Sequence, residues 1–270
     1  MRNKLGVILH HLIALALAAA FILPLVWTVA ASLRPAGLPP PRAIEWIPAT
    51  PTLANYARIF EILPFARYTF NSLLVASVGV LLTLVTASWA GFGMSLLGQR
   101  ARFRLLILSI LLQMIPFTAL WLSRFLLFAK LGITNSYFSL IAPALMGTSP
   151  LFVLLFYWTF RRTDRAIFES AELDGANLFQ TWLRVALPLA RPALMAVGLL
   201  SFLFYWNDFL TPLIYLRSSS LHTLPVGLFH LQQMDRTNWP LLMAAVVVMT
   251  IPAVAVFAAL QRSVLWWESE

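Results

Sequence analysis

The sequence predicts an all-α integral membrane protein that crosses the bilayer several times. Hydrophobic residues make up 60% of the chain, charged residues only 11%, and the mean hydropathy is +0.82. A soluble domain carries about 25% charged residues, whereas a helix crossing the hydrocarbon core needs about 20 predominantly apolar residues. Runs of that length recur from end to end, so we expect residues 1–270 to form a single transmembrane domain.

Six segments are long and apolar enough to span a bilayer with some tilt. We expect these spans at residues 9–31, 70–97, 105–128, 137–160, 189–213 and 240–262. The first follows Arg2 and Lys4 and so resembles a secretion signal. Its apolar run exceeds the roughly 7–15 residues of a signal core, which favours an uncleaved span.

Basic residues between the spans predict the orientation. The short loop GQRARFR, residues 98–104, carries three arginines and no acid, and short cytoplasmic loops are enriched in Lys and Arg. This places both termini in the cytoplasm and the protein in the cytoplasmic (inner) membrane. The net charge of +9 comes from scattered residues and not from a basic patch, which excludes nucleic acid as an expected partner.

The residue inventory excludes several kinds of chemistry. The chain has no cysteine, hence no disulfide or thiolate nucleophile. Its two lysines, Lys4 and Lys130, do not follow a glycine as a P-loop lysine does. The sequence shows no catalytic arrangement, metal site or cofactor motif. We therefore expect a protein that is not an enzyme, and any ATP must be hydrolysed by a separate chain.

A polar segment, residues 164–187, interrupts the apolar pattern between the fourth and fifth spans. Thr163 or Asp164 can cap a first helix, Gly175 suits its left-handed end, and Asn177 can cap a second helix. The residues alone leave two interpretations of this helix–Gly–helix. It is either a surface loop resting on the membrane or a docking element for a partner.

The second helix of this segment is predicted to be amphipathic. Its apolar face comprises Leu178, Phe179, Trp182, Val185 and Ala186, and its polar face comprises Gln180, Thr181 and Arg184.

Motifs in the same segment resemble a known family. Glu169-Ser170-Ala171, Asp174-Gly175-Ala176 and Leu187-Pro188 follow the spacing of the EAA loop found in permease subunits of ABC importers. Ser170 replaces the usual alanine, and the proline that many relatives carry near residues 163–164 is absent. FYWNDFLTPLIYL and LHTLPVGL further resemble the carbohydrate-uptake branch, in particular the second permease of maltose- or glycerol-phosphate-type systems.

This resemblance implies half of the translocation pathway of an ATP-driven sugar importer. It implies as partners a second permease in a heterodimer, two ATPase subunits, an extracytoplasmic solute-binding protein, membrane lipid and a sugar-like solute. The implied ATPase-coupling residues are Glu169, Ser170, Ala171, Asp174, Gly175 and Ala176. Alternatives are another polar solute (glycerol phosphate, an amino sugar or an amino acid), a stand-alone secondary transporter, or a membrane-embedded assembly scaffold.

Three polar residues in or beside the spans are candidates for the translocation pathway. Gln113, midway along the third span, can hydrogen-bond a polar solute or a neighbouring helix. Asn207 and Asp208 can line the outer mouth, because Asp208 lies about 30 Å along a continuous helix from Pro188. An interfacial Asp208 bonded to nearby backbone is the alternative. The same count puts Arg124 at a similar depth, which predicts that Arg124 and Asp208 are neighbours.

Pro116 lies in the middle of the third expected span. Proline removes a helical hydrogen bond and favours a kink there.

Overall fold

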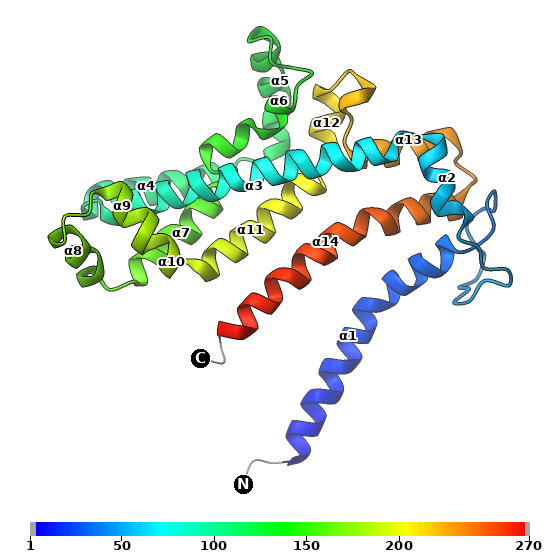
Figure 1. The fold of residues 1–270 in the computed structure, drawn as a ribbon, viewed down its shortest axis with the longest axis horizontal. Helices are drawn as coiled ribbons and strands as arrows, with labels where there is room; N and C mark the ends of the chain where they lie inside the picture. The colour runs from blue at the N-terminus through cyan, green and yellow to red at the C-terminus, as the bar shows by residue number, and fades with distance from the viewer. Residues whose placement is uncertain (1–3, 268–270) are drawn as a thin grey trace. The chain divides into compact units, whose positions relative to one another are not determined.

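The computed structural model describes residues 4–267, and every regular element in that range is a helix (Figure 1). Arg2 lies outside the described residues. In chain order the helices are α1 (Lys4–Ser32), α2 (Ala54–Ile62), α3 (Phe65–Leu96), α4 (Gln99–Met114), η1 (Phe117–Leu120), α5 (Trp121–Lys130), α6 (Tyr137–Ile141), η2 (Ala142–Met146), α7 (Pro150–Arg162), α8 (Arg165–Leu173), α9 (Leu178–Thr181), η3 (Trp182–Ala186), α10 (Leu187–Leu189), α11 (Arg191–Trp206), α12 (Leu210–Tyr215), η4 (Ser219–Leu221), α13 (Leu224–Met234) and α14 (Trp239–Trp267).

The chain divides into two compact units, with boundaries after residues 66, 226 and 252. The first unit contains α1, α2 and the beginning of α14. The second contains nearly all of α3, the helices from α4 to α12, and the end of α14.

Four of the described helical segments are long and apolar enough to cross a membrane: Gly6–Ser32, Phe65–Leu96, Tyr137–Arg162 and Trp239–Gln261. They correspond to the first, second, fourth and sixth expected spans. Two further candidates are pairs of helices with a sharp bend between them, so the count reaches six only if each bent pair is one span.

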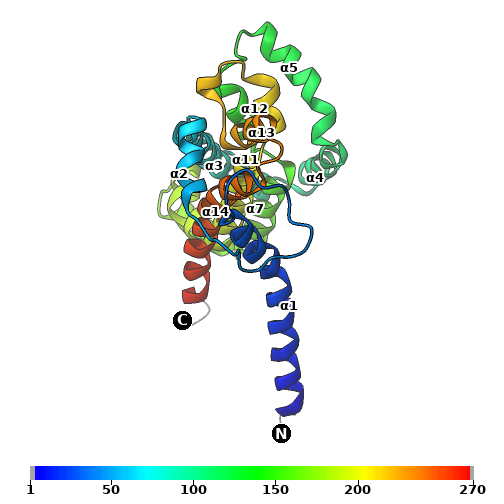
Figure 2. The same ribbon diagram turned by 90° about the vertical axis from the view of Figure 1, so that its right-hand side faces the viewer.

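The third expected span, 105–128, is not one straight helix. α4 ends at Met114, and the chain turns by 85° before the helical segment Phe117–Lys130 (Figure 2). The cause is Pro116, which lacks an N–H and disfavours the helical conformation at Ile115. Ile115 is accordingly extended, with φ −75° and ψ 116°. The expected kink is thus a full change of direction, and a depth for Arg124 counted along one helix does not hold.

The fifth expected span, 189–213, is also interrupted. An 84° bend separates Leu178–Leu189 from Arg191–Trp206, and non-helical residues 207–209 separate α11 from α12. α11 has 16 residues and is therefore about 24 Å long. The length counted from Pro188 to Asp208 includes residues on both sides of the bend, so it does not follow one continuous helix.

An aromatic cluster forms the core of the second unit. The ring of Phe92 on α3 meets Phe160 of α7 and Phe168 of α8 edge to face, at centroid distances of 5.5 and 5.6 Å. Gly91 allows α3 and α7 to approach closely, because a Cβ on it would lie 2.7 Å from the Cβ of Phe156. Small residues at such crossings let membrane helices pack by van der Waals contact alone.

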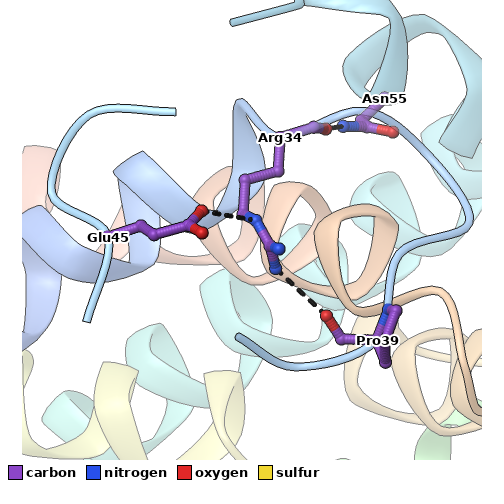
Figure 3. A network of polar contacts seen from close by, with 4 residues as sticks. All are labelled: Arg34, Pro39, Glu45 and Asn55. Atoms are coloured by element: carbon purple, nitrogen blue, oxygen red, sulfur yellow. Dashed lines mark hydrogen bonds and ion pairs between the residues drawn. The ribbon is translucent and has the colours of Figure 1, made fainter. Parts of the chain in front are cut away.

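A long loop in the first unit returns to the end of α1. The N–H of Thr52 donates to the carbonyl of Leu33 at 2.8 Å and closes the loop. The side-chain amide of Asn55 donates to the carbonyls of Ser32 and Arg34 at 2.8 and 2.7 Å. Figure 3 shows Arg34 reaching both Glu45 and Pro39, with Asn55 bonded to its backbone.

Candidate functional site

The polar segment between α7 and α11 forms the two capped helices that its sequence predicts. The Oδ1 of Asp164 accepts a hydrogen bond from the N–H of Ala166 at 3.1 Å and caps α8. Asn177 and Gln180 form a reciprocal capping box at the next helix, with bonds of 2.9 and 3.0 Å. The predicted caps at Asp164 and Asn177 are confirmed. We call residues 164–187 the hairpin.

Gly175 makes the turn between these helices. Its φ is +84°, in the left-handed region, where a side chain costs roughly 1–2 kcal/mol. The N–H of Ala176 donates to the carbonyl of Ala171, and the N–H of Gly175 to the carbonyl of Glu172, both at 3.0 Å. This pair of bonds is a Schellman motif, which satisfies the last carbonyls of α8. The turn predicted at Gly175 is therefore confirmed.

The hairpin is anchored to the rest of its unit by aromatic side chains. Phe168 on α8 and Trp182 on η3 are 5% and 4% exposed and belong to the core cluster. Trp182 packs edge to face against Trp89 of α3 at 5.1 Å. Because proteins pack their cores densely, a displacement of the hairpin is expected to be transmitted to α3 and α7.

The predicted faces of the second helix need two corrections. Trp182 and Ala186 are buried as expected, but Leu178 and Phe179 remain about half exposed. Thr181, assigned to the polar face, is instead buried, with 1% of its surface exposed. Its hydroxyl donates a hydrogen bond to the carbonyl of Asn177, so the buried polar group is satisfied.

The candidate coupling residues lie around the hairpin's turn. Glu169, Ser170, Asp174 and Gly175 are exposed, and Ala171 and Ala176 are partly buried against the turn. Glu169 pairs with Arg165 one turn earlier at 3.0 Å, and the hydroxyl of Ser170 donates to the carbonyl of Ile167. Beside them Leu173 is 89% exposed.

A second candidate region lies where three interrupted helices of the second unit meet. The interruptions are residues 115–116 between α4 and η1, residues 147–149 between η2 and α7, and residues 207–209 between α11 and α12. We call these segments and their contacting side chains the break cluster.

A side-chain contact joins each pair of interruptions. Ser149 donates to the Oε1 of Gln113 at 3.1 Å, the hydroxyls of Thr148 and Tyr205 lie 2.8 Å apart, and the rings of Phe117 and Phe204 meet edge to face at 5.4 Å. Non-helical backbone at membrane depth is tolerated only inside protein or beside a water-filled cavity.

Thr148 is the most constrained residue of the break cluster. It has φ 61°, which is an outlier for a β-branched side chain. Its hydroxyl bonds both Thr83 of α3 and Tyr205 of α11. Tyr205 in turn packs closely against α3, since a Cβ on Gly79 would lie 2.6 Å from an atom of its ring. These contacts hold three helices at one point.

Arg124 and Asp208 lie at another edge of the break cluster. The guanidinium of Arg124 stacks over Phe117 at 4.7 Å and is close enough to act electrostatically on Asp208. Within the described residues no ion pair of 4.0 Å or less joins them. Asp208 instead accepts from the N–H of Thr211 at 3.1 Å. Among the described residues, Nη1 of Arg124 and Nε1 of Trp121 are buried without a hydrogen-bond partner.

The other two pathway candidates differ in their surroundings. Gln113 is exposed, with its amide oxygen on Ser149. Asn207 is also exposed and donates to the carbonyl of Leu203 in its own helix, at 2.9 Å. Sequence reasoning missed Trp121, Thr148 and Tyr205 as members of this cluster, because no motif or spacing links residues that far apart.

A separate cavity of about 650 Å³ lies between α3, α11 and the end of α14. It is lined almost wholly by apolar side chains such as Leu81, Leu194 and Phe202. Such a lining offers few hydrogen bonds to a polar solute, which leaves the break cluster as the better candidate for a polar pathway.

Residues 79–264 match the family model described as the binding-protein-dependent transport system inner membrane component. The match covers well over half of the chain. The chain belongs to this family. The matched range includes both the hairpin and the break cluster.

Two relatives in this transport family align along most of their length. The chain is 33% identical to the arabinooligosaccharides transport system permease protein AraQ of Halalkalibacterium halodurans, covering 97% of this chain and 95% of the relative. It is 30% identical to the trehalose/maltose transport system permease protein MalG of Thermococcus litoralis, covering 93% and 91%.

A solved structure has the same fold. It is a bacterial ABC transporter involved in the import of the acidic polysaccharide alginate, with a TM-score of 0.76 at 20% identity over 97% of this chain and 98% of that chain. The expected all-α membrane fold and the family resemblance are therefore confirmed.

Proposed function

We propose that this chain is the permease subunit of an ATP-driven importer for an oligosaccharide and forms half of its translocation pathway. The chain is an inner membrane component of a binding-protein-dependent transport system. The relatives named for arabinooligosaccharides and for trehalose/maltose favour a sugar over other polar solutes.

The observation that carries this proposal is the hairpin, which is rigid at its base and exposed at its turn. Phe168 and Trp182 hold it to α3 and α7, while Glu169, Leu173 and Asp174 stand in solvent. An exposed leucine beside exposed carboxylates suits a protein partner better than water. We infer that the partner is a cytoplasmic ATPase subunit and that both termini lie on the same side of the membrane.

The pathway is proposed to run past the break cluster. Sugars present many hydroxyl groups and need polar partners along their route. Gln113, Asn207 and Asp208 offer such groups, and broken helices are where membrane transporters place polar backbone and solute contacts.

The transport cycle follows from these two sites. Closure of the ATPase subunits would move the hairpin, and the aromatic cluster would carry that movement into α3, α7 and α11 as a rigid body. A second permease would supply the other half of the pathway, and an extracytoplasmic solute-binding protein would deliver the sugar.

Uptake of radiolabelled arabino- and malto-oligosaccharides tests the proposal. Deletion of the chain should abolish uptake of the transported sugar, and the intact chain should restore it only when an active ATPase partner is present. Uptake that persists without any ATPase would indicate a stand-alone secondary transporter, and unchanged uptake after deletion would exclude a transport role.

Glu169→Lys tests the docking role separately. It should reduce co-purification of the ATPase and solute-stimulated ATP hydrolysis, because it reverses a charge on the exposed turn and places a cation beside Arg165. Arg161→Glu, a charge reversal on an exposed residue outside the hairpin, is the matched control. Normal stimulated hydrolysis in Glu169→Lys would refute docking at this residue.

A further inference from the structure

Three large apolar side chains are exposed together in the loop that follows α1. Ile44, Trp46 and Ile47 are 66%, 46% and 85% exposed. Glu45 lies among them but turns back into the loop, where its Oε2 meets the Nε of Arg34 at 3.1 Å (Figure 3). We call residues 44–47 the apolar tip. Its apolar side chains find no cover within the first unit.

Polar contacts connect the loop that carries the apolar tip to the end of α1. The Arg34 side chain, 11% exposed, holds Glu45 on one side and donates to the carbonyl of Pro39 at 3.0 Å on the other. The loop closes on itself through Thr52 and Leu33 at 2.8 Å. These contacts tie the loop back to the end of α1.

The base of the loop is also bonded to the start of α14. The N–H of Trp239 donates to the carbonyl of Leu38, and the N–H of Gly37 to the Oδ1 of Asn238, both at 3.0 Å. Trp27, near the end of α1, lies 6.4 Å from Trp239, ring to ring. The loop therefore starts where two membrane-spanning helices reach the same face of the bilayer.

The location selects lipid as the neighbour of the apolar tip. α1 ends at Ser32, and its residues 6–26 are exposed. The most apolar 18 residues of the helix have a mean hydropathy of 2.5, as expected for contact with hydrocarbon. The apolar tip lies in the loop that follows the end of this helix, and tryptophan is enriched where membrane helices reach the headgroups. The neighbouring Arg42 is exposed and has the charge that a lipid phosphate attracts.

We propose that the apolar tip inserts into the headgroup region of the leaflet at which α1 ends, with Ile44, Trp46 and Ile47 among the upper acyl carbons and Arg42 at the phosphates. The salt bridge between Arg34 and Glu45 sets the direction of insertion. This inference depends on α1 and α14 crossing the membrane and not on the identity of the solute.

The absence of cysteine from the chain allows a direct test. Ile47→Cys is labelled with an environment-sensitive nitrobenzoxadiazole dye, and the full chain is reconstituted into vesicles of phosphatidylcholine and phosphatidylglycerol. We expect a blue-shifted emission that lipids brominated near the headgroup quench. Leu173→Cys, at a residue that is 89% exposed but lies on the hairpin, is the control and should keep water-like, unquenched emission.

A second variant tests whether the ion pair between Arg34 and Glu45 orients the apolar tip. Glu45→Gln removes the ion pair, so the dye at position 47 should lose part of its blue shift and of its quenching. Co-purified lipid, circular dichroism and intact insertion show that the variant is folded.

Two results would overturn the proposal. Water-like emission at position 47 in vesicles would show that the apolar tip stays in solvent. A blue shift that brominated lipid does not quench, or that arises only after a solute-binding protein or second permease is added, would show that the apolar tip contacts protein instead.

Discussion

Gly175 and Gly79 show at the residue scale that a glycine can be required for two different reasons. At Gly175 the space is open, since no atom lies within 4 Å of a Cβ built there, but φ is +84°. At Gly79 the space itself is missing, because the ring of Tyr205 occupies it. The two positions therefore predict different responses to substitution.

Gly175→Ala should loosen the hairpin without unfolding the protein. A left-handed alanine costs roughly 1–2 kcal/mol, whereas asparagine tolerates this conformation better. We expect solute-stimulated ATP hydrolysis to fall in Gly175→Ala and to be partly retained in Gly175→Asn. Equal activity of the alanine variant and the unchanged protein would show that the turn does not need its left-handed residue.

Gly79→Ala should destabilise the packing of α3 on α11. Its Cβ would lie 2.6 Å from a ring atom of Tyr205, and overpacking of this kind costs roughly 1–3 kcal/mol. We expect a lower midpoint in thermal unfolding of the detergent-solubilised protein. Gly93→Ala on the same helix is the control, since no atom lies within 4 Å of its Cβ, and it should not lower the midpoint, because alanine is the better helix former.

At the scale of elements, the hairpin is joined to its unit by few side chains. Phe168 is the single buried residue of α8, so the position of that helix depends on one aromatic ring. Phe179 on the second helix contacts Trp89 and Trp182 but is 55% exposed.

Phe168→Ala should uncouple the hairpin from the transmembrane helices. Truncation of a buried phenylalanine costs roughly 3–5 kcal/mol, which α8 alone would have to absorb. We expect faster hydrogen exchange in residues 165–173 and loss of solute-stimulated ATP hydrolysis, with membrane insertion retained. Phe179→Ala should have a smaller effect on both. Slow exchange in Phe168→Ala would mean that other contacts hold the helix.

The interruptions of the helices also belong to the scale of elements, and the sequence predicts some of them better than others. The bend after α4 was expected from Pro116, although its size, 85°, was not. The interruption at residues 147–149 was not expected, because the fourth span was assigned from its overall length and hydrophobicity, although Gly147-Thr148-Ser149-Pro150 contains no large apolar residue. A hydrophobic run predicts the length of a membrane segment and its apolar surroundings, but not whether the helix is straight.

At the scale of the whole molecule, the proposed pathway makes transport depend on how the break cluster meets the solute. Asp208→Asn should raise the KM for uptake, because it removes a carboxylate of the proposed pathway while its amide oxygen can still accept from the N–H of Thr211. The thermal midpoint should change little. Asp235→Asn, at an exposed loop residue, is the control and should transport normally. An unchanged KM in Asp208→Asn would remove Asp208 from the proposed pathway.

The sequence by itself determined the membrane class, the positions of the apolar segments and the two caps and glycine turn of the hairpin. These are local properties: the length of an apolar run, the oxygen of a capping side chain, and the one residue that accepts a left-handed φ at little cost. The family motif lies in the same short stretch and could be recognised for the same reason.

Only the tertiary structure decided which interruptions meet and which apolar residues stay uncovered. Thr148 and Tyr205 are 57 residues apart, and Gln113 and Ser149 are 36 apart, so no periodicity links them. Likewise, nothing in the sequence distinguishes Glu45 from Ile47, which lie in the same loop. In the structure Glu45 is paired with Arg34 within the loop, whereas the side chain of Ile47 stays exposed. Contacts of this kind form between distant residues once the helices pack, and that packing is set by the whole chain at once.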